Sequence, residues 1–301
     1  VFERPILDGH NAVPVGNGDL AAVAWQPEHL VWMLNKCDIH GSASQAARLS
    51  VVTPEPIAGR VGRLETRLSL AEAAGTVTYT GGLLPQSAGW TWRGKPGAAP
   101  PVTEKDKGSV RARFFVPHGR NVFLLSYDET EAVPHPVAFV FERWVQQAFG
   151  DKVSATVRGN TAVISYTIDK PEYAGSFAAV LAFDGFAGAT LTQTSPTRVE
   201  LQVPAAAAFS GRIAVAVVTS LESDDPPAAA AALAAATLRE PEAALWAAHT
   251  AAWSRFWERS FVDAGHPYVN ALYHMSLYQL GVTSQGRMPV KFNGALNLYT
   301  E

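Results

Sequence analysis

The stretch SVRARFFV, residues 109–116, decides the fold class, because its polar and apolar side chains alternate with a period of two. Arg111 and Arg113 fall on one face, and Val110, Ala112 and Phe114 fall on the other. An extended strand with one buried face presents side chains in this way. The same alternation returns in TAVISYTI, residues 161–168, where every second position is Ala, Ile, Tyr or Ile. Both stretches therefore predict half-buried β-strands.

Extended segments of this kind fill the chain from residue 19 to about residue 220. Ten strands are predicted, at residues 30–34, 63–70, 76–80, 109–116, 122–127, 137–144, 161–168, 177–183, 198–203 and 212–219. Turn residues such as Gly81-Gly82, Pro100-Pro101 and Gly159-Asn160 separate them. Because no helical pattern intervenes, these strands predict a large antiparallel β-sandwich.

The pattern changes at DDPP, residues 224–227, a typical helix entrance because acidic residues and proline favour the first turn. Helices are predicted at residues 228–238, 240–261 and 268–280. Trp246, Trp253 and Trp257 share one face of the second helix and predict packing against the sandwich edge or a following helical domain. The third helix is apolar on nearly every side, is expected to be buried between other helices, and stops at Gly281. Since the residues up to Glu301 supply no such partners, we expect the full protein to continue.

Composition excludes several classes of function. Twenty-four Lys and Arg residues against 27 Asp and Glu residues give a formal charge of −3, which excludes nucleic-acid binding by bulk charge. Apolar runs such as residues 213–218 and 228–236 are too short for a membrane span, which needs about 20 residues. Cys37 is the only cysteine, and the eight histidines show no metal-ligand spacing. Neither a disulfide nor a local metal site is therefore predicted.

Two glycine-rich loops match nucleotide-binding motifs in spacing alone. GNGDLA, residues 16–21, fits the G-x-G-x-x-A dinucleotide pattern, but Pro27 ends the segment too early for a helix, so we interpret it as a turn between two strands. GWTWRGK, residues 89–95, has phosphate-loop spacing, but Pro96 stands where a hydroxyl must hold Mg²⁺. No cofactor is therefore expected. Trp90 and Trp92 in this loop instead either stack on a sugar ring or fill a domain interface.

Motifs at both ends of the chain are similar to those of a known enzyme family. PVGNGDLAAV occupies residues 14–23, and LNKCDIHG occupies residues 34–41. They resemble the P-x-G-N-G-x-L-G-A and L-N-E-D-T-L-W-x-G segments of glycoside hydrolase family 95, which contains alpha-L-fucosidases and alpha-L-galactosidases. The chain is closer to an uncharacterised bacterial branch, with which it shares W-x-x-F-W-x-R-S at residues 253–260 and P-x-K-F-N-G at residues 289–294.

The resemblance implies an N-terminal β-supersandwich at residues 1–222, a helical linker at residues 223–264, and the beginning of an (α/α)6 barrel at residues 265–301. It implies an inverting glycoside hydrolase that acts on an oligosaccharide or polysaccharide, with its acid and base in the remaining barrel. The family's H-x-N-x-N motif has no match in the chain, so no catalytic residue is carried over and the chain alone is expected to be inactive. Carbohydrate-degrading relatives are commonly exported, which implies an extracytoplasmic location.

Four further residues are candidates for substrate contact. Lys291 and Asn293 follow the third helix, and they either donate hydrogen bonds to sugar hydroxyls or belong to a turn at Asn293-Gly294. Asp38 and His40 either line a surface that closes over the substrate or hold a turn through bonds to the backbone. The departure from E-D-T-L-W at residues 36–40 leaves the sugar undetermined.

Two classes of function remain: part of a glycoside hydrolase, or a non-catalytic carbohydrate-binding or interaction module. A self-sufficient module should not end on a helix that is apolar all round. This favours the enzyme.

Overall fold

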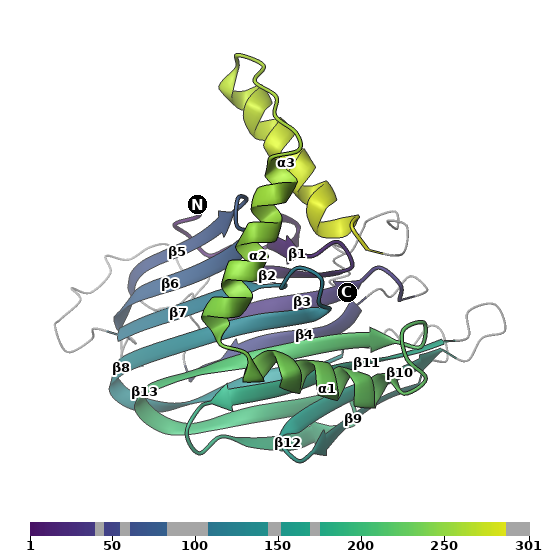
Figure 1. Cartoon of the computed structure of the whole chain (residues 1–301). Helices are drawn as coiled ribbons and strands as arrows, with labels where there is room; N and C mark the ends of the chain where they lie inside the picture. Colours follow the sequence, from purple (N-terminus) through teal and green to yellow (C-terminus); the bar gives the residue numbers. More distant parts are fainter. Residues whose placement is uncertain (40–44, 55–60, 83–107, 144–151, 169–174, 287–301) are drawn as a thin grey trace.

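The computed structural model describes residues 1–39, 45–54, 61–82, 108–143, 152–168 and 175–286 (Figure 1). Within these residues, a 3-10 helix and thirteen strands precede three α-helices. They are η1 (Gly9–Asn11), β1 (Val13–Gly16), β2 (Leu20–Trp25), β3 (Leu30–Lys36), β4 (Gln45–Val52), β5 (Val61–Ser69), β6 (Ala74–Gly82), β7 (Gly108–Phe115), β8 (Val122–Glu142), β9 (Lys152–Arg158), β10 (Thr161–Ile168), β11 (Gly175–Gly185), β12 (Thr190–Ser195), β13 (Arg198–Thr219), α1 (Pro226–Arg239), α2 (Glu242–Trp257) and α3 (Pro267–Thr283). The predicted fold class, mainly antiparallel β with C-terminal helices, is confirmed.

The strands form two layers that share the long strands β8 and β13. One layer has the order β5-β6-β7-β8-β13-β11-β10-β9, and the other has the order β1-β2-β3-β4-β8-β13-β12. The first half of β8 pairs with β7 and its second half pairs with β4. All pairings are antiparallel. Two strands therefore tie the layers together covalently.

The core between the layers follows the alternation of the sequence. Val110, Ala112 and Phe114 of β7 are buried and point inward. Trp32 of β3 lies across from them, with its ring centroid 5.6 Å from that of Phe114 and 5.9 Å from that of Phe123 in β8. Each large buried aromatic side chain contributes on the order of 2–3 kcal/mol to stability through the hydrophobic effect.

Two long strands, β8 and β13, each contain two of the predicted strands, one at either end. The segment at 122–127 and the first six residues of the segment at 137–144 belong to β8, which ends at Glu142. The segments at 198–203 and 212–219 belong to β13. The pairing of these strands shifts register between Val203 and Ala208. Pro136 and Pro204 lie near this irregular part, where proline is tolerated because a regular ladder is already interrupted. The break in alternation marks a bend between layers and not the end of a strand.

Helix α1 lies across the outer face of β11 and β13 (Figure 1). The side chain of Asp225 caps it by accepting a hydrogen bond from the Ala228 amide, at 3.1 Å, as the DDPP entrance predicts. Ala230 and Ala234 are fully buried on the helix face toward the sheet. Because alanine side chains are small, the alanine-rich run allows the helix to lie close to the strands.

Arginines of the sandwich hold the corner between α1 and α2. Arg212 donates to the carbonyl oxygens of Leu238 and Glu240, at 2.7 and 3.0 Å. Arg120 pairs with the carboxylate of Glu240 at 2.5 Å. A cation at the last carbonyls of α1 also complements the negative end of the helix dipole. The corner is therefore fixed before α2 leaves the sheet.

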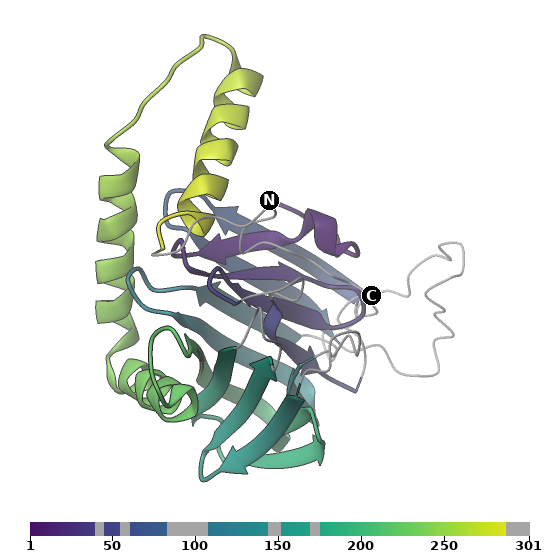
Figure 2. The same ribbon diagram turned by 90° about the vertical axis from the view of Figure 1, so that its right-hand side faces the viewer.

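Helices α2 and α3 form a hairpin whose connecting loop projects beyond the sandwich (Figure 2). Trp246 of α2 packs on Phe115 of β7, with centroids 5.2 Å apart, and Trp253 packs on Tyr278 of α3 at 5.6 Å. The tryptophan face thus contacts both the sandwich and a helix. The prediction that α3 stops at Gly281 is wrong, because the helix continues to Thr283. A Cβ atom at Gly281 would lie 2.9 Å from the ring of Phe256. This glycine permits close helix packing.

The expected burial of α3 holds only at its C-terminal end. Tyr278 and Val282 are fully buried, whereas other large apolar side chains of α3 and of the preceding loop are exposed: Phe261, Val262, Tyr268, Val269, Leu272, Met275 and Leu280. On this part of α3, Trp257 of α2 packs on His274, with ring centroids 6.0 Å apart, while the apolar side chains named above remain exposed within the described residues. Among all the residues that the structure describes, no helix is both long enough and apolar enough to cross a membrane.

His249 makes the α2 interface sensitive to acid. Its ring is 1 % exposed and lies 4.8 Å from that of Phe115, and its Nε2 donates to the Glu72 carbonyl at 2.7 Å. Burial lowers the pKa of His249 to about 4. In the unfolded state the histidine has a pKa near 6.5. Between pH 6.5 and pH 4 the unfolded state therefore binds a proton that the folded state does not bind, and the free energy of unfolding falls as the pH falls.

We expect this one residue to remove up to about 3 kcal/mol of unfolding free energy between pH 6.5 and pH 4. Urea unfolding at a series of pH values checks this prediction. The control is the His249→Gln variant, which lacks this histidine and keeps every other titratable group. The pH profile of the variant should be flatter by that amount. Parallel profiles for the two proteins would contradict the assignment.

Candidate functional site

A fully buried lysine is surrounded by three carboxylates at the end of the sandwich where β3 stops. The Nζ atom of Lys36 lies 2.7 Å from Oδ1 of Asp38, 3.0 Å from Oδ2 of Asp19 and 3.2 Å from Oε1 of Glu222. The lysine side chain is 0 % exposed, that of Asp38 is 4 % exposed, and those of Asp19 and Glu222 are partly exposed. We call these four residues the Lys36 network.

Two neutral side chains complete the hydrogen bonds of the Lys36 network. Thr219, the last residue of β13, donates from Oγ1 to Oδ2 of Asp38 at 2.7 Å. Asn121, just before β8, donates from Nδ2 to Asp19 at 2.8 Å and to Glu222 at 3.0 Å. The network therefore joins the starts of β2 and β8 to the ends of β3 and β13, which are brought together from distant parts of the sequence.

Local turn chemistry places the carboxylates. Asn17 accepts hydrogen bonds from the amides of Asp19 and Leu20 at 3.0 and 2.9 Å, which closes the turn between β1 and β2. This confirms the interpretation of GNGDLA as a turn between strands. Glu222 accepts from the amide of Thr219 at 2.9 Å and so closes the turn after β13. Each turn aims one carboxylate at the lysine.

The electrostatic balance keeps Lys36 charged. Burial alone would lower the pKa of its ammonium group, but the charges of Asp38, Asp19 and Glu222 outweigh burial and raise the pKa above its usual value. Three carboxylates around one ammonium group leave an excess of negative charge. The second oxygen of Glu222 accepts from the Thr219 amide, and Oδ1 of Asp19 is buried without a hydrogen-bond partner among the described residues.

Of the residues predicted to contact substrate, Asp38 belongs to the Lys36 network. The others lie outside the described residues: His40, Trp90, Trp92, Lys291 and Asn293. Among the described residues, Asp38 pairs with the side chains of Lys36 and Thr219.

Sequence reasoning missed Lys36, Glu222 and Asn121. For Lys36 a signal existed, because Lys36 and Asp38 are two residues apart and therefore share one face of an extended chain. Glu222 and Asn121 are brought in by the pairing of distant strands, which the sequence does not reveal.

A small hollow borders the Lys36 network. It has a volume of about 60 Å³, and its lining includes Asp38, Thr219, Ser176 and Ser220. Ligand pockets for small molecules are usually about 300–1,000 Å³, so this hollow has room for water or a single hydroxyl group and not for a sugar ring. No group of three or more His, Cys, Asp or Glu side chains among the described residues is arranged to hold a metal ion.

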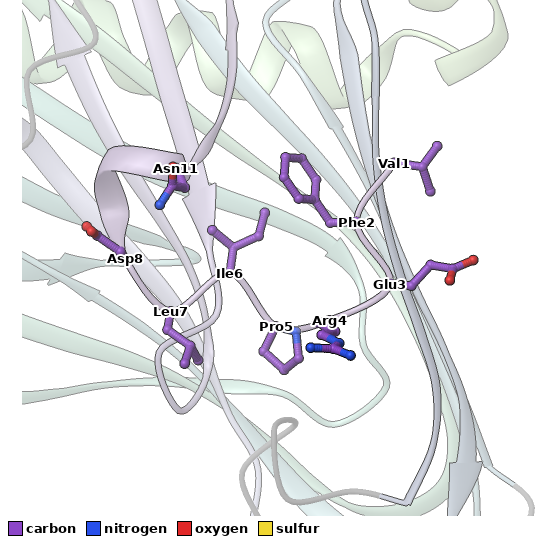
Figure 3. A pocket seen from close by; sticks show the side chains of 9 residues that line it. All are labelled: Val1, Phe2, Glu3, Arg4, Pro5, Ile6, Leu7, Asp8 and Asn11. Atoms are coloured by element: carbon purple, nitrogen blue, oxygen red, sulfur yellow. The ribbon is translucent and has the colours of Figure 1, made fainter.

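Two larger hollows lie away from the Lys36 network. One, of about 620 Å³, is lined by the N-terminal segment at residues 1–8 and by Asn11, and the carboxylates of Glu3 and Asp8 point in opposite directions from it (Figure 3). The other, of about 510 Å³, lies beside Pro54, Pro136 and Pro204. Neither has a paired acid and base among its described lining residues.

Comparisons with known proteins find similar folds in solved structures of carbohydrate-acting enzymes. No protein-family model matches the sequence, and no curated protein sequence matches it significantly. Solved structures do match. A human-microbiome protein assigned as a kojibiose phosphorylase has a TM-score of 0.58 at 8 % identity, over 89 % of this chain and 39 % of its own. A bacterial glucoamylase in complex with acarbose has a TM-score of 0.55 at 10 % identity, over 94 % of this chain and 42 % of its own.

A family GH92 alpha-mannosidase from Bacteroides thetaiotaomicron is also similar, with a TM-score of 0.51 at 10 % identity, over 89 % of this chain and 38 % of its own. At these identities the likeness shows the fold. The chain spans about two fifths of the length of each of these enzymes. The broader expectation of a glycosidase-like fold is therefore confirmed, whereas these structures do not single out family 95.

Proposed function

We propose that this chain is the N-terminal sandwich and first helices of an enzyme that acts on glycosidic bonds, and that its catalytic groups lie in a helical domain after Glu301. The observation that carries this proposal is the extent of the structural match. Between 89 and 94 % of the chain aligns with carbohydrate-acting enzymes that are more than twice as long. The alignment therefore includes most of the chain and leaves the larger part of each enzyme without a counterpart.

The exposed side of α3 supports a following helical domain. Tyr268 is 71 % exposed, Leu272 is 55 % exposed and Leu280 is 58 % exposed, all on one seventeen-residue helix. Clustered apolar side chains on a surface mark an interaction site. In this proposal α3 is the first helix of the (α/α)6 barrel, and residues 223–264 form the linker.

The finer assignment rests on the resemblance to family 95. On that basis the enzyme is a fucosidase-like glycoside hydrolase of inverting mechanism, exported from the cytoplasm, with an oligosaccharide or polysaccharide substrate. Lys291, Asn293, His40, Trp90 and Trp92 are its proposed sugar contacts. Asp38 contributes indirectly in this arrangement, because both of its oxygens already bind Lys36 and Thr219.

The test uses the complete gene product with a panel of aryl glycosides, led by aryl alpha-L-fucoside and alpha-L-galactoside. A second panel offers disaccharides with inorganic phosphate, because one structural neighbour is assigned as a phosphorylase. We expect hydrolysis of at least one glycoside, with the first product of opposite anomeric configuration to the substrate by proton NMR. Retention of configuration would contradict the inverting mechanism.

Phosphate-dependent cleavage without hydrolysis would contradict the hydrolase and keep the broader carbohydrate-active assignment. Sugar binding by calorimetry without any turnover would instead favour the non-catalytic module.

A further inference from the structure

Part of the outer face of strands β5 to β8 carries only polar side chains. In residues 63–67, 76–80, 109–113 and 126–130, the first, third and fifth side chains point away from the core, on the side of the sheet where α1 lies. They belong to four arginines, six threonines or serines, one aspartate and one glutamate. We call these outward residues the arginine face. Within the described residues, no helix covers most of it, and it lies to the left of α2 in Figure 1.

Cross-strand pairing places arginines on both sides of a column of threonines. Arg67 of β5 lies opposite Thr76 of β6, which lies opposite Arg113 of β7 on its other side. In the next row, Thr78 lies opposite Arg111 of β7. Neighbouring strands are about 4.8 Å apart, so β5 and β7 are separated by about 10 Å, with the threonines of β6 between them.

Two of the four arginines have carboxylate partners. Arg113 pairs with Glu242 at the start of α2, and its Cζ lies 4.9 Å from the ring centroid of Trp246. Arg63 lies 3.4 Å from Glu65 in the same strand. The charges of these two arginines are therefore compensated within the protein.

The other two arginines are exposed and uncompensated. Among the described residues, Arg67 and Arg111 take part in no ion pair, although Asp128 lies opposite Arg111 in the ladder. A guanidinium group offers a planar fork of donors that binds carboxylates and other oxyanions in a bidentate manner. This surface therefore presents two anion-binding groups on a protein whose net charge is negative.

The pattern of the arginine face favours a ligand whose anionic groups are separated. Double-stranded DNA carries one charge about every 1.7 Å along its axis, and the two carboxylates of the face would repel such a continuous line of charge. A polysaccharide with uronate or sulfate groups has hydroxyl groups between its charges. On the arginine face, Thr76 and Thr78 likewise lie between Arg67 and Arg111.

We propose that the arginine face binds an acidic polysaccharide, with Arg67 and Arg111 pairing with its carboxylate or sulfate groups. The choice of a polysaccharide as the partner rests on the proposed function. Binding of an anionic polymer can nevertheless be measured without any turnover.

The test measures the affinity of the complete gene product for three polymers by affinity electrophoresis. Polygalacturonate carries carboxylates, dextran sulfate carries sulfates, and dextran is the neutral control. We expect at least one anionic polymer to bind about tenfold more tightly than dextran, and its affinity to fall as salt is added. Arg67→Gln and Arg111→Gln should each weaken that binding about threefold, and the double variant about tenfold.

Arg158→Gln is the matched control. Arg158 is an exposed arginine of β9, at the opposite end of the same layer, so its replacement removes the same charge far from the arginine face. It should leave the affinity unchanged. An equal loss in this control, or no loss in the double variant, would overturn the inference.

The polymers themselves also decide the outcome. Tighter binding of polygalacturonate or of dextran sulfate supports the inference and identifies the anionic group. Binding to neither, equal binding to dextran, or tighter binding to double-stranded DNA would overturn it. An absence of glycoside turnover in the wild-type gene product would count against the proposed function, whereas the measured affinities alone decide the role of the arginine face.

Discussion

Replacing Lys36 with methionine is expected to lower the free energy of unfolding by about 3–5 kcal/mol, the cost usually found when one partner of a buried ion pair is removed. The methionine side chain fills much of the same volume, so packing changes little. The loss arises because the Asp38 carboxyl group, which is 4 % exposed, is left buried without the ammonium group that lies 2.7 Å away. Urea unfolding at pH 7, followed by circular dichroism, measures the effect.

The control is an arginine with similar partners at the surface. Arg63 lies 3.4 Å from Glu65 and is 70 % exposed, so Arg63→Met should cost less than about 1 kcal/mol. Adding Asp38→Asn to Lys36→Met should recover part of the lost stability, because it removes one of the uncompensated charges. A Lys36→Met protein as stable as the Arg63→Met protein would contradict the role given to the Lys36 network.

Replacing Trp253 with alanine is expected to cost about 3–5 kcal/mol and to release α3 from α2. The Trp253 side chain is 1 % exposed, and its ring lies 5.0 Å from Phe256 and 5.6 Å from Tyr278. Tyr278 is among the few fully buried side chains of α3, so the helix loses its main apolar contact with α2. Hydrogen exchange of the α3 amides, together with urea unfolding, measures both effects.

Trp253→Phe is the matched control for this prediction. The indole Nε1 of Trp253 is buried and has no hydrogen-bond partner among the described residues, so phenylalanine removes volume and no hydrogen bond. We expect it to cost less than half as much as alanine and to keep the α3 amides protected. Equal losses for the two variants would show that ring packing is not what holds the hairpin.

The strands could be predicted because each signal is local. Alternation in residues 109–116 and 161–168 depends only on which side chains face the core, and both stretches lie in strands. The continuity of β8 and β13 could not be predicted, because strands that pass between layers lose their alternation at the bend. The predicted second helix ends early, at Trp257 and not at residue 261, and Phe261, which was predicted to be its last residue, is exposed in the following loop.

The site was less accessible to sequence reasoning than the fold. The spacing of Lys36 and Asp38 is a local signal. Glu222 reaches Lys36, and Asn121 reaches Asp19, only across more than 100 residues of sequence. Gly18 illustrates the same limit. Its positive φ agrees with a predicted turn, but its contact with Gln285 depends on how α3 returns to the sandwich. Sequence spacing alone therefore describes the turn and not its partner.

The central claim is that the sandwich and its three helices supply structure and docking, while catalysis belongs to a domain that follows. The most direct measurement compares turnover by residues 1–301 with turnover by the complete gene product, on the glycoside that the latter cleaves fastest. The account predicts that the 301-residue chain leaves the glycoside at its uncatalysed rate, whereas the complete product cleaves it. Turnover by the 301-residue chain at a rate comparable to that of the complete product would contradict the account.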